Sequence, residues 1–338
     1  MIQALLSNLY VSIIAIILSC FAINYFADIL GENLQIIAIK AKISPSARGV
    51  LLDGISSSMP EFLSSVIAAL MVLGIIGEPN PDAFTDIGIG TIGGSAIFNI
   101  LIIPFLSVLF VPSKKLDEIV IDKKAMIRDL IVYSIFVFIL FIACYKFGEL
   151  TPMIGVVMTV IYVLYGIYLA TQSKHHNEEE FAKYSNHSIP FLAGKALLAL
   201  VPIAFTVHIA IEATIVVGNY FHIPLLVMAL VLNAAVTSIP DALLSVRSAR
   251  NGELDASISN AVGSNSFDIA ICLGFVIALA RTKIAVDYQS ISYVFVFLIL
   301  SAIAYTTSFY FKVSKATKLL LLGATYAIFI GYLCYIVK

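Results

Sequence analysis

The sequence predicts an all-α integral membrane protein with ten transmembrane helices in two inverted five-helix repeats. Three observations predict this fold: the composition, the spacing of the apolar segments and an internal duplication. Of the 338 residues, 60% are hydrophobic and 12% are charged, whereas soluble domains average about 45–50% and about 25%. Because the bilayer core holds no water, apolar segments of this length must be helices, in which every backbone group has a partner.

The same composition excludes a soluble enzyme, a disordered chain and a disulfide-rich secreted module. The net charge of −1 leaves no basic excess for a nucleic-acid partner. Four cysteines lie far apart in apolar segments, and we interpret them as small buried hydrophobic residues. The first charged residue is Asp28, so the positive start of a cleavable signal peptide is missing and residues 2–26 are expected to form a retained helix.

Ten apolar segments are long enough to be considered as membrane spans. A polar stretch at 172–190 separates five of them from the other five and is expected to be a solvated loop. The predicted spans are 2–27, 46–74, 86–110, 127–144, 152–171, 193–218, 223–246, 255–280, 290–311 and 319–337.

The basic residues predict the orientation. One set of connecting segments holds 16 of the 20 Lys and Arg residues, and the opposite set holds Lys146, Arg281, Lys283 and Lys338. Positive residues favour the cytoplasmic side, which predicts a multi-pass protein of the cell membrane with a cytoplasmic 172–190 loop and both termini outside. Since each half has an odd number of spans, the second repeat (191–338) must be inverted relative to the first (1–171).

Two short sequence blocks occur in both halves, in the same order. Residues 57–65 read SSMPEFLSS and residues 237–245 read TSIPDALLS, with four of nine positions identical. Residues 94–100 read GSAIFNI and residues 263–269 read GSNSFDI, with four of seven identical. Matched blocks on matched spans indicate an internal duplication.

The first block of each half predicts an interrupted helix. Pro60 and Pro240 have no backbone N–H, so the carbonyls of Ser56 and Val236 lose their helical partner. Freed carbonyls at membrane depth are tolerated where they line a cavity or bind an ion.

The polar side chains of the blocks carry oxygen atoms at helical spacing. Hydroxyls three and four residues before each acid share its helix face, and each second block pairs a serine with an amide or acid four residues on. These residues are Ser57, Ser58 and Glu61; Thr237, Ser238 and Asp241; Ser95 and Asn99; and Ser264 and Asp268. Oxygen ligands without His or Cys suit hard cations such as Ca²⁺, Na⁺ or Mg²⁺.

The acids of these blocks lie within apolar spans. A charge at the bilayer centre costs about 2.5–3.5 kcal/mol on insertion scales, and the blocks contain no Lys or Arg. The predicted counter-charge for Glu61, Asp241 and Asp268 is therefore a transported cation or a proton. The glycines in and before the second blocks (Gly90, Gly93, Gly94 and Gly263) are expected to allow close helix approach or a kink.

SSSMPEFLSS and VTSIPDALLS resemble the alpha-repeat motifs of the cation/calcium exchanger superfamily, and GSAIFNI and GSNSFDI resemble the second half of each repeat. The alpha motifs would span 54–100 and 234–269. The resemblance implies ten helices in two inverted halves, with long first and sixth helices sliding across sites enclosed by the second, third, seventh and eighth. It implies a central calcium site at Glu61 and Asp241. The flanking sodium sites would use Ser57, Ser58, Ser95, Thr237, Ser238 and Ser264, with main-chain carbonyls near Gly54 and Ala234, while Asn99 and Asp268 occupy the remaining polar positions.

The sequence departs from the family pattern at two matched pairs. Ser56 and Val236 stand where the family usually has glycine, and Asp53 and Asn233 stand where small or apolar residues are usual. Asp53 fits either an extra cation or proton site or a hydrated position.

Two further polar pairs lie four residues apart on the first and sixth spans: Asn24 with Asp28, and His208 with Glu212. A bonded pair near an interface explains both. A proton relay is the alternative for the second.

These features predict a secondary antiporter that exchanges Ca²⁺ for Na⁺ by alternating access, with no cofactor and no covalent chemistry. An exchanger of the same fold driven by H⁺, or carrying Mg²⁺, is the nearest alternative. A passive cation channel is a rival of another class. An intramembrane enzyme is disfavoured because no nucleophile–base pair accompanies the acids.

Overall fold

The computed structural model of the chain describes residues 6–41, 54–112, 121–172, 188–252, 254–280 and 282–337. Within these ranges the regular elements are helices, apart from one pair of two-residue strands, and turns and loops connect them. Eight helices of the described residues are long and apolar enough to cross a membrane, and a ninth span results if one bent helix pair is counted as one. The predicted all-α membrane fold is confirmed, while the number of ten spans stays a prediction.

The elements of the first half are α2 (Leu9–Lys40), α4 (Gly54–Ser57), α5 (Met59–Val72), η2 (Phe84–Ile89), α6 (Gly90–Phe110), α8 (Lys123–Ile142), η3 (Ala143–Phe147), β1 (Glu149–Leu150) and α9 (Pro152–Gln172). Those of the second half are α11 (Ile189–Phe221), α12 (Leu225–Met228), η4 (Ala229–Asn233), α13 (Ala234–Thr237), α14 (Ile239–Asn251), α15 (Leu254–Phe267), η5 (Asp268–Leu273), α16 (Gly274–Leu279), β2 (Ile284–Ala285), α17 (Tyr288–Tyr310) and α18 (Lys315–Ile336).

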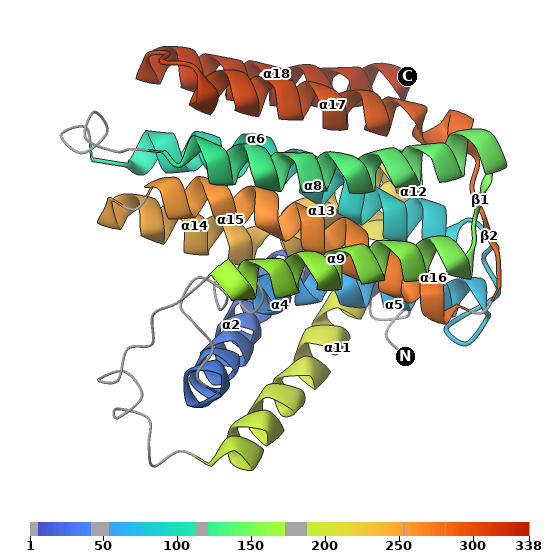
Figure 1. Ribbon diagram of the computed structural model, residues 1–338. Helices are drawn as coiled ribbons and strands as arrows, with labels where there is room; N and C mark the ends of the chain where they lie inside the picture. The colour runs from blue at the N-terminus through green and yellow to red at the C-terminus, as the bar shows by residue number, and fades with distance from the viewer. Residues whose placement is uncertain are drawn as a thin grey trace.

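Helix α6 lies in the middle of the bundle and packs against α14, α15, α17 and α18. The long helices α2 and α11 pack side by side and run obliquely to the other helices, at the bottom of Figure 1. Strands β1 and β2 join the halves at the right-hand end of Figure 1, where Glu149 pairs antiparallel with Ala285. The fold therefore sets a crossing pair of long helices beside a compact bundle.

Helix α2 is longer than its predicted span, which ended at residue 27. It begins after Asn8, whose side chain accepts the Tyr10 N–H at 2.9 Å, and continues to Lys40. The acids Asp28 and Glu32 do not end the helix, because they lie on its exposed face while Leu30 continues the buried face. Single acids interrupt a hydropathy pattern without interrupting helical hydrogen bonding.

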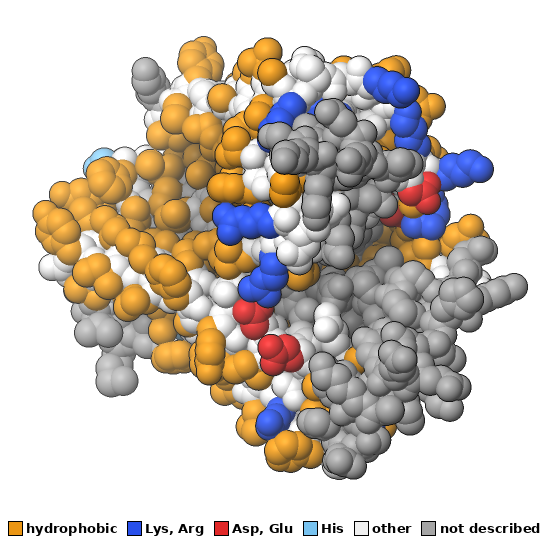
Figure 2. Space-filling model, turned by 90° about the vertical axis from the view of Figure 1, so that its left-hand side faces the viewer, with side chains coloured by type: hydrophobic (Ala, Val, Ile, Leu, Met, Phe, Trp, Pro, Cys, Tyr) orange, Lys and Arg blue, Asp and Glu red, His pale blue; other side chains and the backbone are white. Residues whose placement is uncertain are grey.

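The surface of the molecule separates apolar sides from a basic end. Figure 2 shows hydrophobic side chains along the flank and Lys and Arg side chains around the end that faces the viewer. This basic end is the left-hand side of Figure 1. Helices α2, α8, α14 and α18 each begin or end there, with a basic residue at or next to that terminus. These residues are Lys40, Lys123, Arg250 and Lys315. All of them belong to the larger basic set of the sequence.

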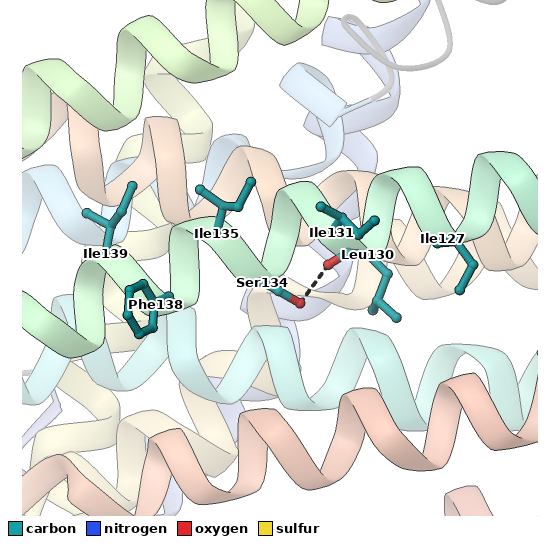
Figure 3. A pocket seen from close by; sticks show the side chains of 7 residues that line it. All are labelled: Ile127, Leu130, Ile131, Ser134, Ile135, Phe138 and Ile139. Carbon is teal, nitrogen blue, oxygen red and sulfur yellow. Dashed lines mark hydrogen bonds between the residues drawn. The ribbon is translucent and has the colours of Figure 1, made fainter.

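The outward face of α8 shows how this surface suits a hydrocarbon environment. A shallow apolar groove runs along the helix, and the only polar side chain among the residues shown in Figure 3 is Ser134. Its hydroxyl donates to the Leu130 carbonyl at 2.7 Å, so no polar group is left for lipid to satisfy. The groove is lined by Ile127, Leu130, Ile131, Ser134, Ile135, Phe138 and Ile139.

Candidate cation-binding site

Both predicted helix interruptions are present. Helix α4 ends at Ser57 and α5 begins at Met59, while α13 ends at Thr237 and α14 begins at Ile239. The second interruption bends the chain by 48°. In each case a proline two residues after a serine lies in the first turn of the following helix, where its missing N–H costs no helical hydrogen bond.

The first interruption brings Glu61 into a cluster of oxygens, here called the Glu61 cluster. Its Oε1 accepts the hydroxyl of Ser95 at 3.2 Å and the hydroxyl of Ser238 at 3.3 Å. The two hydroxyl oxygens lie 2.7 Å apart. All three side chains are completely buried. The cluster joins α5 and α6 of the first half to the α13–α14 break of the second.

The second interruption forms a matching arrangement, the Asp241 cluster. Ser264 donates its hydroxyl to Asp241 Oδ2 at 2.7 Å, and its oxygen lies 3.0 Å from the hydroxyl oxygen of Ser58. These three side chains are also buried. This cluster joins α14 and α15 of the second half to the α4–α5 break of the first. Each acid thus meets a serine of its own half, and that serine meets the break serine of the other half.

Asn99 and Asp268 lie beside the two clusters. The Asn99 amide donates to Asn265 Oδ1 at 3.0 Å and to Ser95 Oγ at 3.4 Å. Asp268 Oδ1 accepts the thiol of Cys272, with the sulfur 3.7 Å away. Both residues are fully buried. The structure therefore brings all three predicted acids and Asn99 into the region where α5, α6, α14, α15 and η5 meet.

Several buried acceptor oxygens in this region have no hydrogen-bond partner among the described residues. They are Glu61 Oε2, Asp268 Oδ2 and Asn99 Oδ1. A buried carboxylate oxygen without a partner is costly. A cation bound between the clusters would satisfy these atoms. The described residues contain no group of three His, Cys, Asp or Glu side chains placed to hold a metal, so any cation must take hydroxyl, amide or carbonyl oxygens as well.

The remaining predicted ligands make local hydrogen bonds. The Thr237 hydroxyl donates to the carbonyls of Asn233 and Ala234 at 3.0 and 3.3 Å. The carbonyls of Gly54 and Ala234 accept the N–H groups of Ser58 and Ser238, each at 3.0 Å. A carbonyl oxygen has two lone pairs, so the Gly54 carbonyl keeps capacity for an ion, whereas the Ala234 carbonyl already accepts two donors. Ser57 is buried at the end of α4.

Sequence reasoning did not select three residues that the structure places in this region. Asn265 donates to the Ala96 carbonyl at 2.8 Å while accepting from Asn99. Asn260 approaches Asp241 Oδ1 at 3.5 Å and Ser245 Oγ at 3.3 Å. Cys272 was interpreted as a small hydrophobic residue. The available signal was helical spacing, since Asn260 and Cys272 lie four residues before Ser264 and four after Asp268.

The predicted close approach is confirmed for the glycines on α6, while a kink at Gly263 stays a prediction. A Cβ at Gly94 would lie 2.1 Å from the Leu230 carbonyl oxygen, and one at Gly93 would lie 2.7 Å from Val294. Gly263 has no atom within 4 Å of that position, so its helix makes no close approach there. At the matched glycines, α6 is therefore packed closely against its neighbours and α15 is not.

Other polar residues named from the sequence lie around this region or outside the described part. Asp53 lies outside the described residues. Its counterpart Asn233 accepts the hydroxyl of Thr214, on α11, at 2.7 Å. His208 Nδ1 is buried and has no hydrogen-bond partner among the described residues. The expected pairing of His208 with Glu212, and that of Asn24 with Asp28, stay predictions.

Known proteins place the chain in a family. The family model described as sodium/calcium exchanger protein matches residues 11–171 and 191–338. The chain belongs to this sodium/calcium exchanger family. The match covers most of the chain and is interrupted at the polar stretch between the halves. The members of this family are ion-transporting membrane proteins and not enzymes.

Similar proteins extend the family assignment along the chain. Inner membrane protein YrbG of Escherichia coli is 25% identical over 268 residues, 77% of each chain. An uncharacterised membrane protein of Methanocaldococcus jannaschii is 24% identical over 307 residues, covering 91% of this chain and 93% of that one. Sodium/potassium/calcium exchanger 5 of Homo sapiens is 49% identical over 71 residues, 21% of this chain and 14% of the human protein.

A solved structure of the sodium-calcium exchanger NCX_Mj, soaked with Na⁺ and Sr²⁺, has the same fold. It superimposes with a TM-score of 0.64 and covers 96% of this chain and 99% of its own, at 21% identity. This likeness shows the fold of the exchanger family in the chain.

Proposed function

We propose that this exchanger-family protein is a secondary antiporter that exchanges Ca²⁺ for Na⁺ by alternating access. The observation that carries the proposal is the pair of oxygen clusters, each with one buried carboxylate and serine hydroxyls from both halves. Glu61 and Asp241 act as the central calcium ligands. Hydroxyl and carbonyl oxygens beside them hold sodium: Ser57, Ser58, Ser95, Thr237, Ser238, Ser264, Gly54 and Ala234. Asn99 and Asp268 occupy the remaining polar positions.

The oxygen spacing supports cation binding. Calcium binds oxygen at about 2.3–2.6 Å, so neighbouring ligands around one ion lie about 2.8–3.4 Å apart. The three oxygens of the Glu61 cluster are separated by 2.7, 3.2 and 3.3 Å. An ion entering this cluster replaces hydroxyl-to-carboxylate bonds with metal–oxygen bonds and leaves the side chains nearly in place.

Charge supports coupling between the two ions. Two buried carboxylates balance one Ca²⁺, and Na⁺ ions at overlapping oxygens balance the same charge. An empty site exposes its carboxylates to a low dielectric, which opposes any rearrangement that buries them further. Only the protein with bound ions then changes between its two access states at an appreciable rate. Transport of Ca²⁺ in one direction is therefore coupled to transport of Na⁺ in the other.

The packing of the long helices α2 and α11 supports the alternating-access part of the proposal. Helix α2 packs against α4, α13 and α14, and α11 packs against α5. Both therefore lie against the segments that carry the acids, and a shift of this pair opens the site to one side or the other. Helices α2 and α11 correspond to the first and sixth spans, one from each half.

We also propose that residues 1–171 and 191–338 are inverted five-helix repeats, joined by a cytoplasmic linker at 172–190. The matched clusters support this arrangement, since Glu61, Ser95 and Ser238 correspond by motif to Asp241, Ser264 and Ser58. The gathering of basic residues at one end supports the cytoplasmic linker, with both termini outside the cell membrane.

Reconstitution in vesicles tests the function. Vesicles loaded with Na⁺ and diluted into Na⁺-free buffer with radioactive Ca²⁺ are expected to accumulate Ca²⁺ above its equilibrium level, with and without K⁺ in parallel. Dissipating the Na⁺ gradient with an ionophore should stop the accumulation. Equal Ca²⁺ entry without the gradient would identify a passive channel and overturn the proposal.

An H⁺-driven exchanger is the second candidate, because the Nδ1 atom of the half-buried His208 on α11 is buried without a hydrogen-bond partner among the described residues. In the same vesicles, accumulation driven by a pH gradient and not by Na⁺ would favour it. Replacing Ca²⁺ with Mg²⁺ as the added cation tests the cargo. Ca²⁺ accumulation in His208→Ala that keeps the parent pH profile would remove the case for a proton relay.

A further inference from the structure

Cys272 is part of the hydrophobic core, yet its sulfur also contacts two polar groups of the candidate site. It sits on η5, fully buried. Its sulfur lies 3.5 Å from the Ser58 carbonyl oxygen and 3.7 Å from Asp268 Oδ1. The two contacts come from opposite halves of the chain. A single thiol therefore bridges the helix break of the first half and the third buried acid.

The distances among these three atoms match those around a bound metal ion. Zinc binds sulfur at about 2.3 Å and oxygen at about 2.0–2.2 Å in tetrahedral geometry, so sulfur and oxygen ligands of one ion lie about 3.6 Å apart. The two observed separations are 3.5 and 3.7 Å. Both sulfur–oxygen separations therefore suit a metal ion bound beside the Cys272 sulfur.

A second observation points to a ligand at this position. Asp268 is fully buried, and its Oδ2 has no hydrogen-bond partner among the described residues. The carboxylate thus retains an acceptor that a metal ion would use. A thiolate and a carboxylate together also balance the two charges of a divalent ion, whereas an Asp268 carboxylate beside a neutral thiol is uncompensated.

We propose that Cys272 Sγ, the Asp268 carboxylate and the Ser58 carbonyl form a subsite for thiophilic divalent cations such as Zn²⁺ and Cd²⁺. On binding, the metal–sulfur bond forms as the thiol proton leaves to solvent, and no electrons are transferred. Sulfur is a soft ligand that Ca²⁺ and Na⁺ do not prefer, so this subsite gives soft ions an affinity that oxygen ligands alone would not. The inference rests on the proposed function for access, because the ion reaches a fully buried thiol through the cation path.

Titration of the purified full-length protein with Cd²⁺ tests the subsite directly. The expected result is an ultraviolet cadmium–thiolate charge-transfer band that saturates at one ion per chain. Cys272→Ser should abolish this band. Cys144→Ser is the matched control, because Cys144 is also buried in the core but belongs to η3, whereas Cys272 contacts Ser58 and Asp268, and it should leave the band intact. Cys334→Ser corrects for the exposed thiol.

The transport assay supplies a second readout. Cys272→Ser should raise the Cd²⁺ concentration that halves Ca²⁺ accumulation by about tenfold or more relative to the KM for Ca²⁺ in the same variant, because one soft ligand is lost. Cys272→Ala should behave alike, and size-exclusion chromatography checks that both variants fold. A band or Cd²⁺ sensitivity unchanged in both variants would overturn the subsite and place Cd²⁺ at oxygen ligands alone.

The two proposals fail separately. A Cys272-dependent band in a protein that shows no Na⁺-driven Ca²⁺ accumulation would refute the proposed antiport and support the subsite. Normal Na⁺-driven Ca²⁺ accumulation without the cadmium–thiolate band would support the antiport and refute the subsite.

Discussion

The Glu61 and Asp241 clusters are alike in composition and differ in how well each acid is satisfied. Glu61 accepts two hydroxyls on one oxygen, at 3.2 and 3.3 Å, and its other oxygen has no partner among the described residues. Asp241 uses both oxygens, with Ser264 at 2.7 Å and Asn260 at 3.5 Å. Duplicated motifs thus form one acid that is held in place and one that keeps an oxygen for an incoming ion.

The difference extends to the second block of each half. Asn99 is neutral and donates to the Asn265 amide and the Ser95 hydroxyl, whereas its counterpart Asp268 is a third acid and lies beside a thiol. The second half therefore contributes two acids and the first half one. The two halves are thus alike in geometry at this site and differ in charge.

The largest expected effect comes from neutralising either central acid. Glu61→Gln and Asp241→Asn should each lower Na⁺-driven Ca²⁺ accumulation by at least about 100-fold, equivalent to about 2.7 kcal/mol, because one divalent ion needs both carboxylates. Vesicle uptake measures the loss, and size-exclusion chromatography verifies folding. Normal uptake in either variant would show that the two clusters do not share one ion.

A large effect on stability is expected at one of two matched glycines. Gly94→Ala should destabilise the protein by about 1–3 kcal/mol, since the new Cβ meets the Leu230 carbonyl. Gly263→Ala, with open space around it, should change stability by less than about 1 kcal/mol. Thermal unfolding of the two variants in detergent compares them. Equal unfolding temperatures would contradict the difference in packing between α6 and α15.

The smallest effects concern the two matched serines. Ser264→Ala should raise the KM for Ca²⁺ by about tenfold and Ser95→Ala by about threefold, because the shorter charge-assisted bond orients its acid more strongly. Concentration series in the vesicle assay give both values. A larger effect at Ser95 would reverse the order inferred from the distances of 2.7 and 3.2 Å.

The sequence predicted the membrane fold, both helix interruptions and the burial of the three acids. These features follow from local rules. Long apolar segments in a membrane form helices, proline favours the ends of helices, and an acid within an apolar segment is buried inside the helix bundle. The same local reasoning ended α2 too early, and it offered Gly263 a close approach or a kink, of which the structure shows no close approach. The end of a helix and the approach of a neighbouring helix both depend on residues that are distant in sequence.

Partner choice within the site could not be predicted. Helical spacing put Thr237 on the face of Asp241, yet its hydroxyl bonds the carbonyls of its own helix. The apolar neighbours of Cys272 hid its contact with Ser58, which is 214 residues away in sequence. Hydroxyls and thiols have several acceptors within reach, and backbone packing decides among them.

The sequence by itself determined which oxygen-bearing residues lie within the membrane spans. Acids there are costly to bury, and their occurrence in matched blocks of both halves indicates a functional site. Tertiary structure alone decided which serine meets which acid. Ser238 approaches Glu61 across 177 residues and Ser58 approaches Ser264 across 206. Such contacts depend on how two halves interlock, and that geometry is set by packing of whole helices, which no short motif records.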